Sequence, residues 1–231
     1  MDTATDGPKA GAKPKTDTGI GTSTLMRVAT YASVTVATIL IVTKLGAWLA
    51  TESVSLLSSL VDSLLDAGTS LINLFAIYHA LQPADREHRF GHGKAEALAG
   101  LGQAAFIAGS GVFVMLEAID RLINPRAVIN GEVGIGVMVF AIVLTTLLVL
   151  FQAFVVRKTG SLAIRADSFH YRIDILVNAA VILSLFLSSY GGFGMADPLF
   201  AGAIVIYMAF GSWKIALKSL DDLMDREFPD E

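Results

Sequence analysis

The sequence predicts an all-α membrane protein with six transmembrane helices. Of its 231 residues, 54% are hydrophobic and only 16% are charged, and the mean hydropathy is +0.63. These values lie outside the range of soluble globular domains. The apolar residues form separate runs, each near the roughly 20 residues that a helix needs to cross about 30 Å of hydrocarbon. The chain is therefore expected to cross a bilayer several times.

Six apolar runs define the expected helices. They are predicted at residues 24–49, 53–81, 95–123, 133–156, 161–189 and 195–217. The third run contains AGLGQAAFIAGSG, whose glycines and alanines suit close packing between helices in lipid. We expect one six-helix domain over residues 21–218, with a disordered cytoplasmic tail at 1–20 and a short cytoplasmic tail at 219–231.

Basic residues predict the orientation of these helices. The segments expected on one side of the bilayer hold Lys9, Lys13, Lys15, Arg27, Arg86, Arg89, Lys94, Arg157, Lys158, Arg165, Lys214, Lys218 and Arg226. The opposite side offers only Arg121 and Arg126. By the positive-inside rule, both termini lie in the cytoplasm, as N-in/C-in, and a multi-pass protein of the cell (inner) membrane is expected.

Four ionisable residues lie near the middle of two predicted helices. Asp62 and Asp66 occur in LVDSLLDAG, and His170 and Asp174 occur in ADSFHYRIDILVN. Residues four apart share one helix face, so each pair can point the same way. The expected helix directions and a rise of about 1.5 Å per residue put both pairs near the midplane. Two helix faces thus offer four ligands at one depth.

A divalent cation explains why carboxylates are tolerated at that depth. Each isolated charge there costs roughly 2.5 to 3.5 kcal/mol on insertion scales. One imidazole with three carboxylates suits tetrahedral Zn²⁺, whereas Cd²⁺, Fe²⁺, Co²⁺ and Mn²⁺ are less favoured. Ligands bind metal only when deprotonated, so protons compete for the site, with His170 as the proton carrier. The alternative is structural: interhelical hydrogen bonds, or pairing of the aspartates with Lys44 or Arg172.

A second group of potential ligands lies in the loop PADREHRFGHGKAEAL. Asp85, His88 and His92 are spaced three and four apart, which can place all three on one metal ion. The spacing alone is a weak signal, because histidines in a charged loop are more often ordinary surface residues. His79 has no carboxylate four residues away and is interpreted as an interfacial residue. Zero cysteines exclude thiolate sites and disulfides.

Three motifs resemble those of the cation diffusion facilitators, in particular the bacterial proton-coupled zinc exporters. They are DSLLDAG, FGHGKAEAL and ADSFHYRIDILVN, and the resemblance runs from Leu25 to Glu231. It implies a transport site at Asp62, Asp66, His170 and Asp174 and a secondary metal site at Asp85, His88 and His92. It also implies a homodimer, a salt bridge between Lys94 and Asp225, and transport of zinc or cadmium. Family members commonly continue into a cytoplasmic C-terminal domain, which is expected to be absent because this chain stops at DREFPDE.

The expected function is efflux of Zn²⁺ in exchange for protons, by alternating access around the midplane site. Zinc is then the transported substrate rather than a cofactor, and the expected partners are zinc, protons and the lipid bilayer, without nucleic acid. A passive cation channel and a metal-free membrane scaffold remain alternatives. A membrane-embedded metalloprotease would call for a motif such as HExxH, which does not occur. The chain is therefore not expected to be an enzyme.

Overall fold

Long helices form nearly all of the structure, a computed structural model that describes residues 21–123, 132–191 and 196–225. The helices are α1 (Thr22–Thr51), α2 (Val54–Ala80), α3 (Lys94–Ile123), α4 (Glu132–Thr159), α5 (Leu162–Gly191) and α6 (Ala196–Leu223). They confirm the predicted all-α class. The predicted N-terminal tail, residues 1–20, and the last six residues of the predicted C-terminal tail lie outside the described residues.

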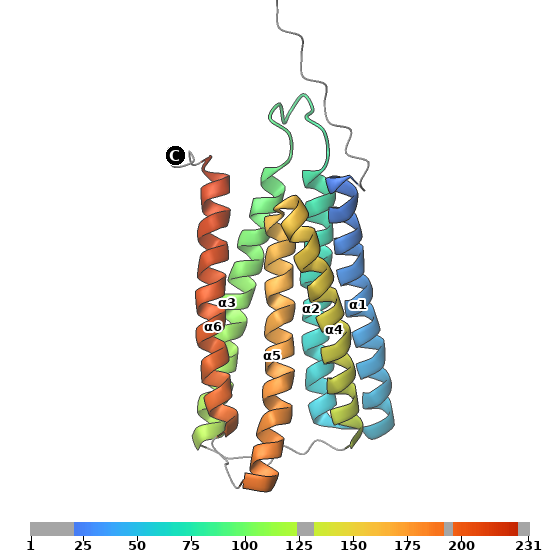
Figure 1. The fold of residues 1–231 in the computed structure, drawn as a ribbon, viewed down its shortest axis with the longest axis vertical. Coiled ribbons are helices and arrows are strands. Elements are labelled where there is room, and N and C mark those ends of the chain that lie inside the picture. Colours follow the sequence, from blue (N-terminus) through green and yellow to red (C-terminus); the bar gives the residue numbers. More distant parts are fainter. Residues whose placement is uncertain (1–20, 124–131, 192–195, 226–231) are drawn as a thin grey trace, which may run out of the picture.

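Five of these helices are long and apolar enough to cross a membrane by length and composition: all except α5. The first half of α5 carries Arg165, Asp167, His170, Arg172 and Asp174, which lowers its hydropathy. It is nevertheless 30 residues long and runs alongside the other helices (Figure 1). Its polar residues are tolerated because several of them face neighbouring helices, as described below.

The helices divide into a bundle and a pair. Figure 1 shows α3 and α6 side by side, while α1, α2 and α4 lie together on the other side of α5. A buried apolar cluster unites the bundle, and its members come from α1, α2, α4 and α5: Met26, Ala29, Ile77, Val155, Ala163 and Ile164. The pair packs on α5 through a second cluster of Ile107, Ile173, Ile204 and Met208. Because α5 contacts both groups, it is central to the fold.

Two tight connections set the helix order. After α1, Glu52 adopts a left-handed conformation with φ 51° and donates its N–H to the Trp48 carbonyl, so α2 starts at once. After α4, Gly160 has φ 71°, a conformation that favours glycine, and α5 begins two residues later. The α4–α5 turn, the start of α1, the end of α6 and the α2–α3 connection (residues 81–93) lie at one end of the molecule, here called the loop end (Figure 1).

Candidate metal sites

Three of the four predicted transport-site residues meet between α2 and α5. One ligand atom from each of Asp66, His170 and Asp174 can be chosen so that all lie within 4.8 Å of one another. His170 Nε2 is 2.9 Å from Asp66 Oδ1 and 3.8 Å from Asp174 Oδ2. Asp66 lies one residue from the centre of α2, which spans 27 residues from Val54 to Ala80. This group, the transport triad, has the nitrogen and oxygen donors that Zn²⁺ binds.

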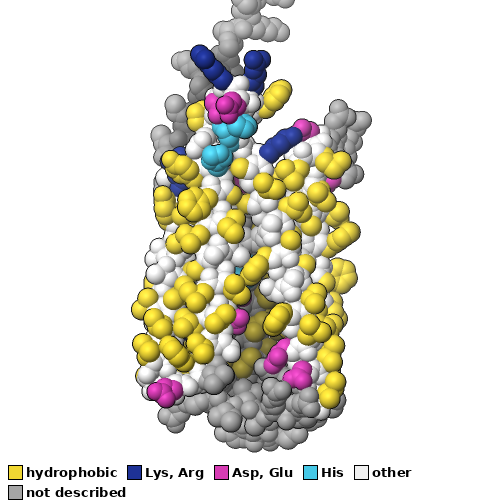
Figure 2. Space-filling view, turned by 180° about the vertical axis from the view of Figure 1, so that it is seen from behind, with side chains coloured by type: hydrophobic (Ala, Val, Ile, Leu, Met, Phe, Trp, Pro, Cys, Tyr) yellow, Lys and Arg dark blue, Asp and Glu magenta, His cyan; other side chains and the backbone are white. Residues whose placement is uncertain are grey.

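Asp62 lies outside this group. It precedes Asp66 by one helical turn on α2, and its side chain is exposed, so it does not converge on His170 as the other two carboxylates do. Exposure of the side chains rises along the site from 6% for His170 to 19% for Asp66 and 28% for Asp174. In each helix the more exposed residue of the pair, Asp62 in α2 and Asp174 in α5, lies farther from the loop end. The triad is therefore more exposed on the side away from the loop end. Figure 2 shows a hollow between the helices in the lower half of the molecule, with acidic side chains along its edges.

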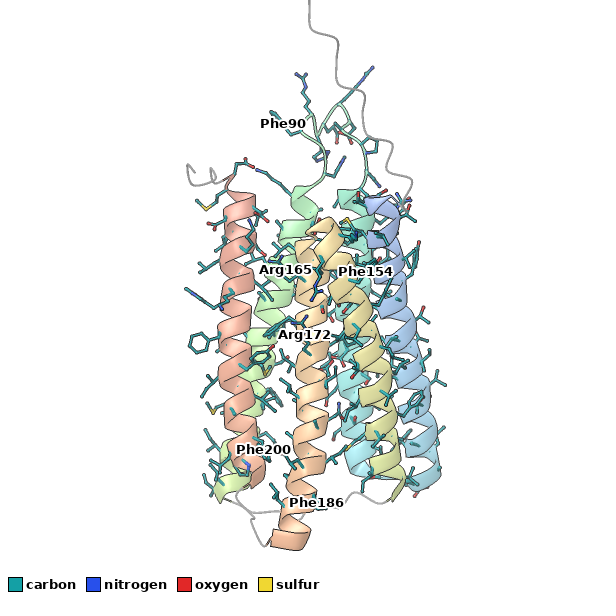
Figure 3. All side chains as sticks on the ribbon, in the orientation of Figure 1. Phe90, Phe154, Arg165, Arg172, Phe186 and Phe200 are labelled. Carbon is teal, nitrogen blue, oxygen red and sulfur yellow. The ribbon has the colours of Figure 1, made fainter. Side chains whose placement is uncertain are left out.

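The two cations named in the structural alternative have other positions. Lys44 is buried, and its Nζ donates to Ser63 Oγ at 2.6 Å and to the Ser59 carbonyl at 3.1 Å rather than to Asp62 or Asp66. Arg172 is exposed and lies on the same side of α5 as Arg165, seven residues earlier (Figure 3). The carboxylates of the triad thus keep oxygen atoms available to a metal ion.

A second cluster of ligands occupies the α2–α3 connection. One ligand atom from each of Asp85, His88 and His92 lies within 4.8 Å of the others. Asp85 Oδ1 is 3.3 Å from His88 Nδ1, and Asp85 Oδ2 is 3.5 Å from His92 Nε2. His92 is buried, whereas Asp85 and His88 are exposed. The structure therefore brings together all three residues of the predicted loop site.

Backbone hydrogen bonds fix the carboxylate of this loop cluster. Asp85 Oδ1 accepts from the N–H of His88 at 2.6 Å and from the N–H of Glu87 at 2.9 Å. The bond from the His88 backbone is the main cause that lowers the pKa of Asp85 below its ordinary value. Asp85 is therefore an ionised acceptor at neutral pH, as a metal ligand needs to be.

Comparison with known proteins gives the family of the chain. The cation efflux transmembrane domain matches residues 30–224. The chain belongs to the cation efflux family. It is 46% identical over 206 residues to proteins named cation-efflux pump FieF from Yersinia pestis (strain Pestoides F) and Yersinia pseudotuberculosis (serotype O:3, strain YPIII). The aligned region covers 89% of this chain and 68% of each relative.

Family membership confirms the predicted resemblance to the cation diffusion facilitators. It also confirms that the chain is a transporter rather than an enzyme, and that the metal cation is its substrate rather than a cofactor. The apolar helices and the family together support a multi-pass membrane protein.

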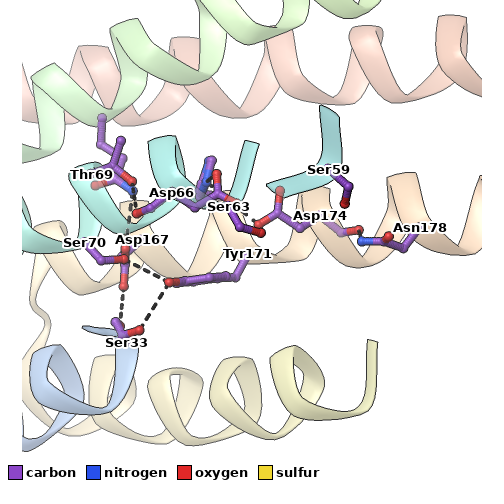
Figure 4. A network of polar contacts seen from close by, with 12 residues as sticks. Ser33, Ser59, Ser63, Asp66, Thr69, Ser70, Asp167, Tyr171, Asp174 and Asn178 are labelled. Atoms are coloured by element: carbon purple, nitrogen blue, oxygen red, sulfur yellow. Dashed lines mark hydrogen bonds and ion pairs between the residues drawn. The ribbon is translucent and has the colours of Figure 1, made fainter. Parts of the chain in front are cut away.

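A buried hydrogen-bond hub next to the triad was not predicted from the sequence. Asp167 is only 1% exposed, one turn before His170 on α5. Its Oδ2 accepts from Ser33 Oγ and from Gln152 Nε2, both at 2.6 Å, and its Oδ1 accepts from Gln103 Nε2 at 3.4 Å. The donors come from α1, α4 and α3, so four helices meet at this carboxylate. Figure 4 shows the bond from Ser33 of α1. Its only sequence signal was a second acidic residue, besides Asp174, in ADSFHYRID.

The path from the triad to the loop end is closed. Ser70 of α2 is fully buried, and its hydroxyl lies 2.9 Å from the Tyr171 hydroxyl of α5 (Figure 4). One turn farther, Asn73 Nδ2 donates to the Ala163 carbonyl at 3.4 Å, and Ile77 is fully buried beyond it. Burial on this side and exposure on the other describe a state that is open away from the loop end.

The predicted pair of Lys94 and Asp225 connects the start of α3 with the end of α6. Lys94 Nζ lies 2.8 Å from Asp225 Oδ2, and it also donates to the Leu223 carbonyl at 3.1 Å. Both side chains are exposed, so the ion pair itself contributes little to stability. The pair marks where the start of α3 and the end of α6 meet at the loop end.

Proposed function

We propose that the chain exports Zn²⁺, and Cd²⁺ as a second substrate, by exchange with protons at the transport triad, with Asp62 as a fourth ligand. The main support is that Asp66, His170 and Asp174 converge between α2 and α5, with His170 Nε2 2.9 Å from Asp66 Oδ1. A nitrogen donor among carboxylates favours zinc over the hard cations Mg²⁺ and Ca²⁺.

The same ligands bind protons or metal, but not both at once. Deprotonated His170 and the aspartates capture the ion, and protons arriving from the other side compete for the ligands and promote its release. Inward movement of protons gains about 2.3 kcal/mol per charge per 100 mV of membrane potential. The basic residues of the loop end support a cytoplasmic location for that end and for both termini. The described state is then open to the outside.

The loop cluster of Asp85, His88 and His92 is proposed as a second zinc site. Its carboxylate is ionised, and its three residues already lie together. It lies at the loop end, away from the triad, which suits a regulatory or recruiting role rather than passage of the ion. The pair of Lys94 and Asp225 is proposed to support a homodimer by fixing the shape of this end.

Zinc uptake into liposomes tests the proposed function. The reconstituted chain is given an acidic interior, external zinc and a zinc-sensitive dye inside. We expect uptake that depends on the pH gradient, and that falls to the level of protein-free liposomes with Asp66→Ala or His170→Ala. Glu52→Gln is the matched control, because it removes an exposed carboxylate from the end of α1 outside the site.

Two results would contradict the proposal in different ways. Zinc entry at the same rate with and without the pH gradient would indicate a passive channel. No entry with protein that is folded by circular dichroism would indicate a metal-free scaffold.

A further inference from the structure

Three of the four histidines of the chain meet at the loop end. The ring centre of His79, the last residue but one of α2, lies 5.2 Å from that of His92, which in turn lies 4.5 Å from that of His88. All three rings line one open cavity. Figure 2 shows histidine side chains gathered at this end of the molecule beside acidic ones. His79 was expected to be an ordinary interfacial residue, but its position beside the loop cluster suggests another role.

We propose that His79 is the fourth protein ligand of the loop metal site, which then holds Zn²⁺ with three histidines and one aspartate. The inference rests on the loop site of the proposed function and extends it. Asp85, His88 and His92 supply three donors, whereas structural zinc sites are usually closed by four. His79 is the nearest further donor that the ring contacts place beside them.

The spacing of the His79 and His92 rings fits a shared metal ion. Zn–N bonds are about 2.05 Å, and a coordinating nitrogen lies about 1.15 Å from its ring centre, so two imidazoles at the tetrahedral angle have centres about 5.2 Å apart. The separation between His79 and His92 is 5.2 Å, with the ring planes at 77°. The His79 side chain is exposed and can rotate, so a nitrogen can turn toward the other ligands without movement of α2.

His92 has a buried ring nitrogen to offer. Its side chain is 6% exposed, and Nε2 lies 3.5 Å from Asp85 Oδ2. Within the described residues, its Nδ1 is buried and has no hydrogen-bond partner. Because Nε2 faces Asp85, it is the nitrogen that His92 offers to a metal ion shared with Asp85 and His88.

His79 changes what an occupied loop site does. Asp85, His88 and His92 all belong to the connection between α2 and α3, so a metal held by them alone would order only that connection. His79 belongs to α2 itself. With His79 as a ligand, the ion ties the end of α2 to a residue two positions before α3.

The connection through the metal ion would extend across the loop end to α6. Lys94, the first residue of α3, contacts both the Leu223 carbonyl and the Asp225 carboxylate. A four-ligand site would therefore restrain the helix bundle against the α3–α6 pair at this end. Zinc at the loop site would in this way regulate the movement that alternating access needs.

Cobalt binding tests the proposal without any dependence on transport. The full chain carries Asp66→Ala and His170→Ala, so that the triad cannot bind, and Co²⁺ is titrated into the protein in detergent. Because the chain has no cysteine, His79→Cys introduces the only thiol. A thiolate that binds Co²⁺ gives a sulfur-to-metal charge-transfer absorption, which appears only if position 79 reaches the ion. His79→Gln removes the ligand, Tyr78→Phe is the neighbouring control, and His92→Gln reports on the loop cluster itself.

We expect the charge-transfer absorption with His79→Cys, and an affinity for Co²⁺ that falls at least about tenfold with His79→Gln. Tyr78→Phe should bind as the background protein does. No charge-transfer absorption together with an unchanged affinity in His79→Gln would overturn the role of His79 while leaving the loop cluster intact. If the background protein shows no Co²⁺ binding that is lost in His92→Gln, the loop site itself is overturned. Zinc flux through the triad does not depend on this result, because it is measured separately.

Discussion

At the scale of single residues, Asp167 shows what polar side chains do in the interior of this transporter. Its carboxylate receives hydrogen bonds from Ser33, Gln152 and Gln103, and it lies one turn from His170. It therefore fixes the segment of α5 that carries His170. It is a positioning residue, and its effect on stability can be separated from an effect on metal binding.

Replacing Asp167 is expected to lower stability strongly. Asp167→Ala removes the acceptor shared by Ser33 Oγ and Gln152 Nε2, whose other acceptors are the Ala29 carbonyl and Ser33 Oγ. A buried donor left short of an acceptor costs roughly 1–3 kcal/mol. The Tm of the detergent-solubilised protein, followed by intrinsic fluorescence, should fall by about 4 °C or more. Asp222→Asn, at an exposed carboxylate near the end of α6, is the control and should leave the Tm nearly unchanged. An unchanged Tm in Asp167→Ala would contradict the role of the hub.

The pH dependence of Asp85 follows from its hydrogen bonds. The His88 and Glu87 backbone donors favour the ionised form, so the pKa of Asp85 is below the ordinary value of about 3.9. The loop is stabilised by this ionisation above about pH 3.9, and it loses the stabilisation as the pH falls through the lower folded value. Carbon-13 NMR of the carboxyl group in metal-free protein should show this lower midpoint. A midpoint equal to that of the same residue in an unfolded peptide would contradict it.

At the scale of helices, the local sequence determines the spacing of the ligands, whereas contacts between distant residues determine the register of α2 against α5. The spacing of four between Asp62 and Asp66, and between His170 and Asp174, predicts which residues share a face. The register decides which of them meet, and it places Asp66, rather than Asp62, against His170. That register depends on contacts between distant residues, such as Ser70 with Tyr171, and these are not readable from local periodicity.

The sequence predicted that glycines would allow close contacts between helices, but it did not predict which glycines make them. The frequent glycines indicated close packing, and the structure shows where it matters. A Cβ added at Gly211 of α6 would overlap the ring of Phe169 of α5, whereas one at Gly202 of the same helix would meet nothing within 4 Å. The position of such a contact depends on how the two helices cross, which the composition does not determine.

Gly211→Ala should therefore weaken the contact between α5 and α6. Overpacking of this kind typically costs about 1–3 kcal/mol, and here it would also displace Phe169, the residue before His170. The Tm should fall and zinc uptake should slow. Gly202→Ala on the same helix is the matched control, since helix propensity favours alanine there by up to about 1 kcal/mol. Equal melting temperatures for the two variants would contradict the close contact.

At the scale of the whole molecule, the fold was predictable because hydropathy and length define membrane helices. The six predicted runs correspond to α1–α6, and their ends differ by six residues or fewer, the largest difference being at the end of α6. The hub at Asp167 was not predictable, because it depends on four helices meeting. The same is true of the asymmetry in which the triad is closed toward the loop end and open toward the other.

Thiol labelling is expected to report this asymmetry. Ser59 and Ser70 both lie on α2, on opposite sides of Asp66, and a serine-to-cysteine change is nearly isosteric. In metal-free protein, Ser59→Cys should react with a water-soluble thiol reagent, because Ser59 is partly exposed. Ser70→Cys should not react, because Ser70 is fully buried against Tyr171. The chain has no other cysteine, so labelling is read without background. Faster labelling at residue 70 would contradict the described state.

Exchange of metal and protons at the triad can be tested by measuring proton movement that zinc drives. Liposomes that hold the chain and a pH-sensitive dye are clamped at zero membrane potential, and zinc is added outside. We expect the interior to become more alkaline as zinc enters, with the wild type and with Glu52→Gln but not with Asp66→Asn. Zinc entry without a change of internal pH, or an unchanged response in Asp66→Asn, would contradict it.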